Sequence, residues 1–442
     1  MTETTRRDFL KSAALSGAAM SASAFTAQGQ AGDAAGRTSV VRLGLIGPGG
    51  QGTGLLQSFA KMSDVRIVWV SDVDAGRLRQ AVEKIKDITG VEPKSAVDFR
   101  QILDDKSVDA VLIAMPDHWH APATILACDA GKHVYVEKPA SHNLREGRLM
   151  IEAARRNKRI VQLGTQSRSV PTIIQAMKRL QDGAIGEVLV AKAWNSQIRR
   201  NIGHHQPTDP PDDLDFDRWT GPAPLVPYQK NLLHSVWRWW HAFGTGDIGN
   251  DGVHDIDIAR WGLGVQTHPS SIAAIGGKYF FDDDQQFPDT MNVAFEYASA
   301  SKAGRPKQLI FEQRIWSPYV QEGYENGNAF YGTRGMLIMG KQQGWTLYKA
   351  KNEKVEEMRA DFSATPHHRN FVDCIRSGNT PNADIEIGHL SSSLCHLGNI
   401  AVRVGRTLKF DPKTEQIHGD EEAAKLLTRE YRGEHWAVPR TT

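Results

Sequence analysis

The chain contains few cysteines, has no strong excess of either charge and lacks a long apolar run. Its three cysteines, Cys128, Cys374 and Cys395, are too few and too scattered to indicate a disulfide framework or a zinc ribbon. The 53 basic and 51 acidic side chains leave a net charge of +2 without a basic block, so we expect neither nucleic acid nor an anionic membrane as a partner. No apolar run is long enough to cross a bilayer, and we expect no membrane span.

The N-terminal residues resemble an export signal. Arg6 and Arg7 stand in the stretch TRRDFLK, and a mildly apolar stretch rich in alanine and serine covers residues 12–27. This order matches a twin-arginine signal peptide, which we assign to residues 1–35. We therefore expect export of the folded protein through the twin-arginine translocon to the periplasm or the cell exterior. The alternative is a disordered basic arm that contains two arginines by chance.

A glycine-rich turn is the clearest motif of the chain. An apolar run at residues 41–46 leads into glycines at G-x-G-x-x-G spacing, and a helical stretch follows. The first glycine permits a tight turn, the second lets the backbone approach a diphosphate, and the third brings helix and strand together. The diphosphate would lie on the free N–H groups at the start of the helix. The predicted cofactor-binding glycines are Gly47, Gly49, Gly50 and Gly52.

Asp72 follows the next apolar run, at residues 65–70, where a carboxylate can accept hydrogen bonds from the 2′- and 3′-hydroxyls of an adenosine ribose. The same charge would repel a 2′-phosphate, so the predicted cofactor is NAD rather than NADP. A glycine-rich turn in some other α/β protein is the alternative.

The order of strand and helix signals predicts two domains in a chain of 442 residues. Up to residue 165, short apolar runs alternate with helical stretches, which is typical of a parallel sheet covered by helices. We assign residues 39–165 to this Rossmann domain. In residues 166–412, several strand-like runs follow one another with few helices between them, which predicts an α/β domain with a largely antiparallel sheet. The polar residues 413–442 are expected to form a surface tail.

Two segments at the ends of predicted strands are expected to border the cofactor, because ligands of such sheets bind beyond the carboxyl ends of the strands. The first, AMPDHWH at residues 114–120, contributes Pro116 and His120 as cofactor contacts. Its His-x-His pair resembles half a metal site, but no matching ligands accompany it, and we predict no metal. The second contributes Glu137 and Lys138 to the cofactor site. The Lys138 ammonium could also stabilise a developing oxyanion, unless it is an ordinary surface lysine.

A third segment, residues 244–261, places Asn250 and His254 four positions apart, and hence on one face of a predicted helix. Histidine suits the removal of a proton from an alcohol while hydride leaves the same carbon. The alternative is a structural histidine that holds the helix start with Asp251 or Asp255. Nearby tryptophans could stack on a sugar ring or belong to the core: Trp194, Trp219, Trp237, Trp239 and Trp240.

Together these segments resemble the glucose–fructose oxidoreductase, inositol dehydrogenase and MocA (Gfo/Idh/MocA) family over residues 40–412. The resemblance rests on GPGGQG, Asp72, EKP at 137–139, GNDGVHDIDIARW at 249–261 and the late segment 367–406. It implies a Rossmann domain followed by an α/β domain whose open, mostly antiparallel sheet binds the substrate. It further implies NAD(P)-dependent oxidation or reduction of a sugar, and often a homodimer or homotetramer. The family's lysine falls on Lys138 and its catalytic histidine on His254.

One position departs from the family pattern, because Asn250 stands where dehydrogenases of this family carry an aspartate. We predict an NAD-dependent sugar or glycoside oxidoreductase in which His254 is the base, Lys138 the electrophilic partner and Asn250 a positioning group. Export in the folded state favours a tightly held cofactor. Two alternatives remain: a glycoside hydrolase or lyase with a transient 3-keto intermediate, and a sugar-binding protein without turnover.

Overall fold

The computed structural model describes residues 40–299 and 304–439. The predicted signal peptide, residues 1–35, lies outside the described residues. Among the described residues, no helix combines the length and the apolar character that crossing a membrane requires.

The first half of the described chain forms a parallel six-stranded sheet in the order β3-β2-β1-β4-β5-β6. Its strands are β1 (Val41–Ile46), β2 (Val65–Ser71), β3 (Lys94–Ala96), β4 (Ala110–Ile113), β5 (His133–Val136) and β6 (Val161–Leu163). The helices between them are α2 (Gly50–Ala60), α3 (Ala75–Thr89), α4 (Arg100–Asp104), α5 (Asp117–Asp129) and α6 (Leu144–Arg156). β4 is fully buried, as a strand covered by helices on both faces requires.

The second sheet has ten strands within the described residues, in the order β14-β13-β12-β11-β7-β10-β9-β8-β15-β16. Only β7 and β10 pair in parallel among these strands. Its first five strands in the chain are β7 (Val188–Asn195), β8 (Ser271–Gly277), β9 (Thr290–Tyr297), β10 (Lys307–Arg314) and β11 (Asn326–Gly332). The others are β12 (Met336–Gly340), β13 (Gly344–Tyr348), β14 (Lys354–Arg359), β15 (Leu408–Asp411) and β16 (Gln416–Ile417). The predicted α/β fold, a parallel Rossmann sheet followed by a mostly antiparallel sheet, is confirmed.

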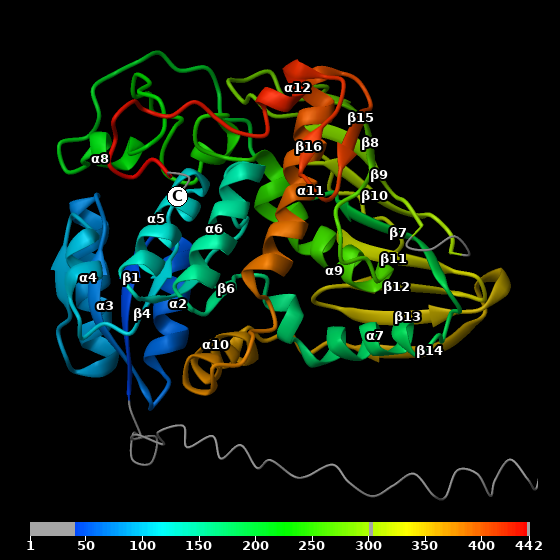
Figure 1. Ribbon diagram of the computed structural model, residues 1–442, viewed down its shortest axis with the longest axis horizontal. Helices are drawn as coiled ribbons and strands as arrows, with labels where there is room; N and C mark the ends of the chain where they lie inside the picture. Colours follow the sequence, from blue (N-terminus) through cyan, green and yellow to red (C-terminus); the bar gives the residue numbers. More distant parts are fainter. Residues whose placement is uncertain (1–39, 300–303, 440–442) are drawn as a thin grey trace, which may run out of the picture. The chain divides into compact units, whose positions relative to one another are not determined.

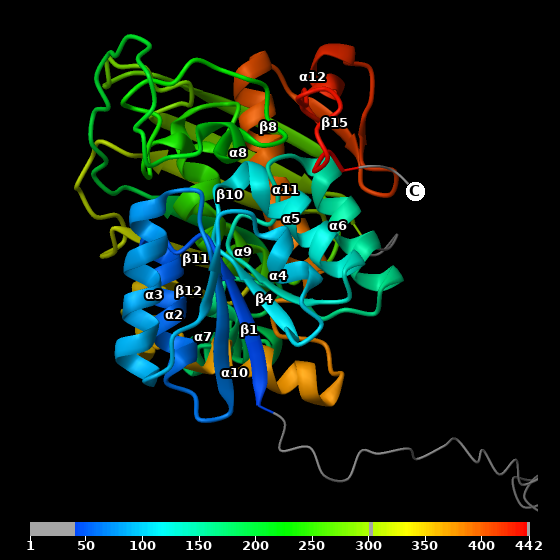
Figure 2. The same ribbon diagram turned by 90° about the vertical axis from the view of Figure 1, so that its left-hand side faces the viewer.

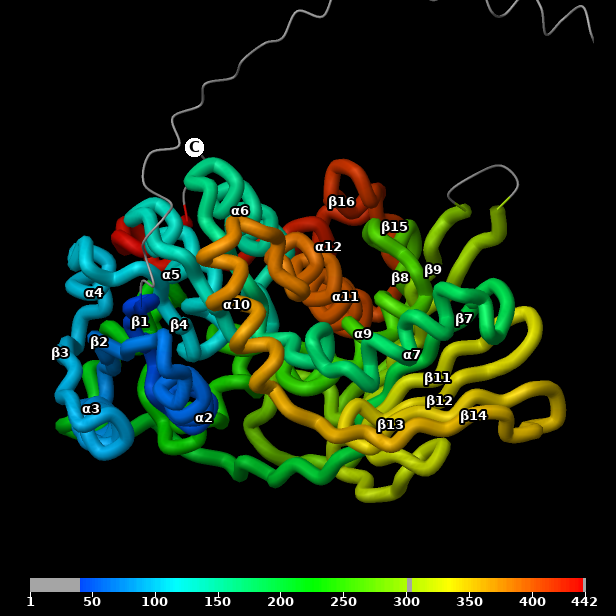
Figure 3. The backbone as a smooth tube through the Cα atoms, turned by 90° about the horizontal axis from the view of Figure 1, so that it is seen from below, coloured from blue at the N-terminus to red at the C-terminus, as the bar shows by residue number. Residues whose placement is uncertain are grey.

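Three helices cover one face of the second sheet and bury its largest apolar cluster. They are α7 (Pro171–Gln181), α9 (Val253–Leu263) and α11 (Ile385–Val404). Figure 3 shows them along one side of that sheet, with α6 and α10 (Thr365–Ser377) next to them. α11 also contacts α6 and β6, so it joins the two sheets into one structure.

A long connection between β7 and α9 lies over the carboxyl ends of the Rossmann strands (Figures 1 and 2). This 204–243 segment contains α8 (Phe216–Thr220) and a short 3₁₀ turn, η2 (Trp237–Trp239). Its backbone pairs with the residues just after Asp72: Ala75 N–H donates to the Asp213 carbonyl, and Asp215 N–H to the Val73 carbonyl, both at 2.9 Å. The segment therefore adds a cover of its own to the edge where the cofactor was predicted.

The described part of residues 413–442, which we expected to form a polar surface tail, is mostly exposed or half-buried but is anchored to the fold. That part contains β16 and α12 (Glu421–Lys425), and Leu427 and Ala437 are buried. Arg429 Nη2 lies 2.7 Å from the buried Glu146 carboxylate, and the Trp436 ring lies 5.8 Å from Trp119. The polar composition of this segment did not indicate these contacts, because a few buried side chains are enough to hold an irregular segment in place.

Candidate active site

The glycine-rich turn has the backbone that a diphosphate-binding loop needs. Gly47 has a φ of +82°, a conformation that residues with a side chain rarely adopt. A Cβ on Gly52 would lie 2.2 Å from the Gly47 carbonyl oxygen, and one on Gly49 would lie 2.6 Å from Arg77 Nη1. A Cβ on Gly50 would meet no atom within 4 Å, so the first turn of α2 opens onto free space where the diphosphate is expected.

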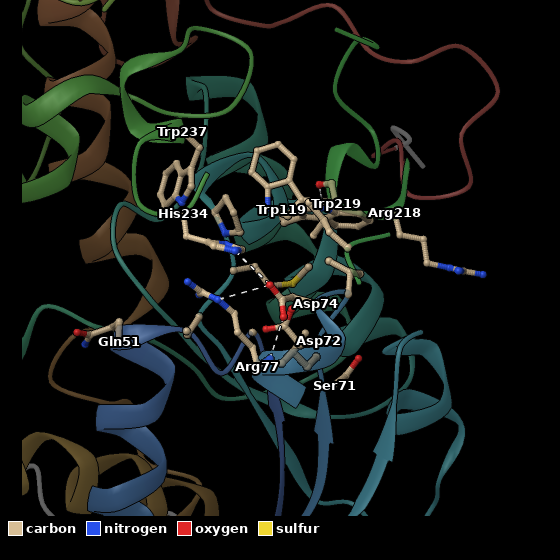
Figure 4. Close-up of a pocket in the computed structure, with 18 of the residues that line it drawn as sticks. Gln51, Ser71, Asp72, Asp74, Arg77, Trp119, Arg218, Trp219, His234 and Trp237 are labelled. Atoms are coloured by element: carbon tan, nitrogen blue, oxygen red, sulfur yellow. Dashed lines mark hydrogen bonds and ion pairs between the residues drawn. The ribbon is translucent and has the colours of Figure 1, made fainter. Parts of the chain in front are cut away.

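A cavity of about 250 Å³ extends from this turn to the end of β2. Asp72 lines it and accepts the Asp74 N–H at 2.9 Å. Burial raises the pKa of Asp72 to about 6. Figure 4 shows Asp72 beside Asp74, with Arg77 and His234 next to this pair. A carboxylate in this place can accept the two ribose hydroxyls, so the residues present fit NAD.

Aromatic side chains from both halves of the chain line this cavity (Figure 4). Trp119 belongs to α5 and Trp219 to α8, and Trp119 Nε1 donates to the Trp219 carbonyl at 2.9 Å. Their flat apolar faces suit the adenine ring. Of the tryptophans considered as sugar platforms, Trp219 and Trp237 line this cofactor cavity instead. The remaining three pack in apolar clusters: Trp194, Trp239 and Trp240.

The 204–243 segment also adds His234 and Arg238 to the cavity, and no sequence motif indicated either residue. His234 Nε2 lies 3.1 Å from Asp74 Oδ2, on the ribose side. Arg238 lines the cavity, and its Nε is buried with no hydrogen-bond partner among the described residues. The guanidinium lies over the Trp237 ring, 5.4 Å from its centroid, and its positive charge can attract an anion such as the diphosphate. No local pattern signals these contacts, because only the folded chain brings this segment over the Rossmann strands.

Of the two residues predicted to contact the cofactor in the segment 114–120, Pro116 lines the cavity and His120 does not. Pro116 is the N-cap residue of α5 and lines the cavity, where a bound cofactor could reach it. The His120 ring is occupied elsewhere, since Nδ1 lies 2.6 Å from the Pro139 carbonyl and Nε2 lies 2.8 Å from the Met115 carbonyl. His120 thus joins the ends of β4 and β5 and is not among the residues that line the cavity. His118 Nε2 contacts the Trp219 carbonyl at 3.0 Å, so the two histidines do not face a common point.

Glu137 connects the cofactor turn to the end of β5. Its buried carboxylate accepts Gln51 Nε2 at 2.8 Å, and Gln51 belongs to the first turn of α2. Burial raises the pKa of Glu137. Glu137 therefore acts on the cofactor site through Gln51, and it also fixes the backbone from which Lys138 projects.

Lys138 spans the gap between the Rossmann sheet and the segment that carries His254. Its Nζ donates to the Asn250 carbonyl at 2.5 Å. Burial lowers the pKa of Lys138, so this ammonium lies in a poorly solvated place where its hydrogen bonds are strong. An ammonium has three N–H donors, and the remaining donors can serve a bound molecule.

We predicted that Asn250 and His254 share one face of an α-helix, and this is wrong. Residues Ile248–Gly252, which include Asn250, form a π-helical turn, η3. π-Turns of this kind occur often at functional sites. The Asn250 side chain donates instead to Asp247 Oδ1 at 2.8 Å. Asp247 is buried and also accepts Arg199 Nε at 3.1 Å and Asn195 Nδ2 at 3.1 Å. The turn is thus anchored to β7 by a carboxylate that the sequence analysis did not select.

His254 begins the regular α9 helix, and its ring makes no hydrogen bond with any described residue. Burial, together with the charges of Lys341 and Lys138, lowers the pKa of His254 to about 3. The imidazole is therefore neutral at physiological pH and has a free nitrogen that can accept a proton.

Lys341, from the turn between β12 and β13, also reaches the site although no sequence motif indicated it. Its buried Nζ lies 3.2 Å from Asp251 Oδ1 and 2.9 Å from Asp255 Oδ2. Burial raises the pKa of Asp255 to about 7. Burial would also raise the pKa of Asp251, but the positive charges of Lys341 and Arg199 outweigh it and hold this pKa below its usual range. Asn250 stands where the family carries an aspartate, and Asp251 and Asp255 were the two acids that could replace that carboxylate. Both are bound to Lys341.

The glycine geometry yields a prediction for cofactor binding. In Gly52→Ala the new methyl would collide with the Gly47 carbonyl, and we expect NAD affinity to fall roughly 10- to 100-fold. Gly54→Ala in the same helix is the matched control, since a Cβ there meets nothing within 4 Å. The measurement is the NAD content of the purified, folded variants. Equal NAD content in both variants would contradict the assignment.

The charge of Lys341 yields a prediction for the His254 pKa. In Lys341→Met a nearby positive charge is lost and two carboxylates are released, and both changes favour the protonated imidazole. We expect the pKa of His254 to rise, whereas Lys341→Arg keeps the charge and leaves it low. NMR titration of the histidine ring signals, assigned with His254→Gln, measures it. An unchanged pKa in a folded Lys341→Met variant would refute this account.

Two family models match the sequence. Residues 41–165 match the NAD-binding Rossmann fold of the Gfo/Idh/MocA oxidoreductase family, and residues 192–438 match the C-terminal alpha/beta domain of an oxidoreductase family of the same group. The second match alone spans more than half of the 442 residues.

Relatives and solved structures agree with this assignment. The chain is 32% identical to the myo-inositol 2-dehydrogenase of Thermotoga maritima, over 84% of this chain and 99% of that one. It is 25% identical to the scyllo-inositol 2-dehydrogenase (NAD(+)) of Bacillus subtilis, over 72% and 80%. A levoglucosan dehydrogenase solved with NADH and levoglucosan superposes with a TM-score of 0.64 at 18% identity, over 84% of this chain and 99% of that one, which shows a shared fold. The chain belongs to the Gfo/Idh/MocA oxidoreductase family, and its first domain is an NAD-binding Rossmann domain.

Proposed function

We propose that this protein is an exported, NAD-dependent dehydrogenase that oxidises a ring hydroxyl of a sugar, polyol or glycoside, or reduces the corresponding ketone. The observation that carries the proposal is the meeting of Lys138, the Asn250 turn and the neutral His254, with Lys138 linked to the cofactor turn through Glu137 and Gln51. The names of the relatives, which act on inositols and levoglucosan, support a ring-shaped polyhydroxylated substrate.

His254 and Lys138 have different roles at the reacting hydroxyl group of the substrate. A free nitrogen of the neutral His254 ring takes the hydroxyl proton, and Lys138 Nζ donates a hydrogen bond to the same oxygen as negative charge develops on it. NAD, when bound, supplies the acceptor for the hydride that leaves the carbon. Asn250 positions Lys138 through its carbonyl, and Asp247 holds Asn250 in place. Both residues thus keep Lys138 oriented without touching the proton that moves.

A panel of sugars, polyols and glycosides tests this function with the NAD-loaded enzyme. We expect NADH to form with at least one of them, and Lys138→Ala and His254→Ala to lower kcat roughly 10²- to 10⁴-fold. His418→Ala, at an exposed histidine, is the control that should keep full activity. Full activity in both site variants would refute the residue assignment. Catalytic release of a free aglycone without net NADH would instead identify the glycosidase, and binding without turnover would identify the sugar-binding protein.

The proposal includes export and a retained cofactor. The TRRDFLK stretch supports passage through the twin-arginine translocon in the folded state, and a free NAD pool is not expected outside. The cavity walls support retention, because the 204–243 segment supplies Trp219 and Arg238 over the Rossmann strands. We also expect a homodimer or homotetramer, which light scattering would measure.

Retention can be tested by prolonged dialysis of the purified enzyme. We expect wild-type protein to keep its NAD, and Trp219→Ala to lose it faster because one aromatic wall of the cavity is removed. Trp316→Ala is the matched control, since Trp316 stacks on Phe280 and is not among the residues that line the cofactor cavity. Rapid loss of NAD from the wild-type protein would refute tight binding.

A further inference from the structure

A second cavity, of about 560 Å³, shares no lining residue with the cofactor cavity. Its walls come from the start of α6, residues 241–245, the last turns of α11 and the segment after α12. Thr245 in its wall donates to the buried Asp117 at the start of α5, at 2.7 Å, which fixes this wall to the Rossmann domain. Neither the family resemblance nor the dehydrogenase chemistry gives this cavity a role.

The cavity carries an excess of positive charge. Arg403, Lys425 and Arg429 line it, and Glu430 is the only carboxylate among its lining residues. The Arg403 and Lys425 side chains have no ion pair or hydrogen bond with any described residue. Arg429 binds the buried Glu146 at 2.7 Å, yet its Nη1 is buried without a partner in the described chain. Two cations are therefore unneutralised at this cavity.

Neutral histidines stand beside these cations. His142 Nε2 contacts the His241 carbonyl at 2.9 Å, so this nitrogen carries the proton and Nδ1 is a free acceptor. Ser141 Oγ donates to the Asn143 carbonyl at 2.8 Å, so it must accept from His396 Nε2, and His396 Nδ1 is again a free acceptor. Burial lowers the pKa of His396 to about 3, and burial with the charge of Arg403 lowers that of His241 to about 4.

Buried amide groups around the cavity also lack partners. Asn143 Nδ2 and Asn399 Oδ1 make no hydrogen bond within the described residues, although both side chains are fixed by their other atom. Buried polar atoms without a protein partner usually bind water or a ligand. The cavity thus combines unneutralised cations with donors and acceptors that suit hydroxyl groups.

We propose that this cavity is a second binding site, for a small polyhydroxylated oxyanion such as a sugar acid or a sugar phosphate. Arg403 and Lys425 bind the anionic group, while His142, His396 and Asn399 bind hydroxyls. The volume falls in the range of small-molecule sites, roughly 300–1,000 Å³. The ligand is separate from the sugar that the enzyme oxidises.

Calorimetric titration of the NAD-loaded enzyme tests the proposal with glucuronate, glucose 6-phosphate, inorganic phosphate and glucose. We expect glucuronate or glucose 6-phosphate, whichever anionic group the site prefers, to bind more tightly than phosphate or glucose. The double variant Arg403→Gln/Lys425→Gln should weaken this binding roughly tenfold or more. Lys351→Gln/Arg359→Gln removes the same charge at exposed positions and should leave it unchanged.

The location is checked by NMR. The ring signals of His241 and His396 should shift on titration while those of His254 stay in place. Equal binding of inorganic phosphate would overturn the recognition of hydroxyls. Absent binding, an equal loss in both double variants, or shifts at His254 alone would overturn the site itself.

Discussion

The site depends on one partly buried hydrogen bond, which Lys138 Nζ donates to the Asn250 carbonyl. It joins the end of a Rossmann strand to the π-turn before His254, so the Rossmann sheet and the start of α9 are held together. Both ends are anchored: Glu137 binds Gln51 of the cofactor turn, and Asn250 binds Asp247, which in turn accepts Asn195 at the end of β7. A continuous chain of hydrogen bonds therefore runs from the diphosphate turn to β7, and it orients Lys138 before any ligand arrives.

Electrostatics then decide which groups are charged. Lys341 binds Asp251 and Asp255 and, with burial, keeps His254 neutral, whereas an isolated histidine beside two carboxylates would tend to be protonated. Although Asn250 replaces the family's aspartate, two carboxylates, Asp251 and Asp255, still lie close to His254. Negative charge is still present, but a buried lysine neutralises it. The low dielectric of the site makes each of these interactions strong.

Much of the first domain was predictable because its signals are local. The glycine turn needs a positive φ at Gly47 and close contact at Gly52, which few other residues allow. Buried parallel strands appear as short apolar runs, so β1 and β2 were expected close to their observed bounds. The second sheet was predicted less completely. β14 is charged and exposed along most of its length, and β11 contains two glycines, so neither resembles a buried strand.

The sequence by itself determined the cofactor turn, the acid after β2 and the order of the two sheets, because periodicity and backbone geometry act over a few neighbouring residues. Only the tertiary structure shows that His120 contacts the carbonyls after β4 and β5, and that the Asn250 side chain donates to Asp247. It also shows that Arg429 anchors the C-terminal segment to Glu146. It also brought Arg238 and Lys341 to the site from distant segments. Such contacts leave no local pattern, since they arise from packing between elements far apart in the chain.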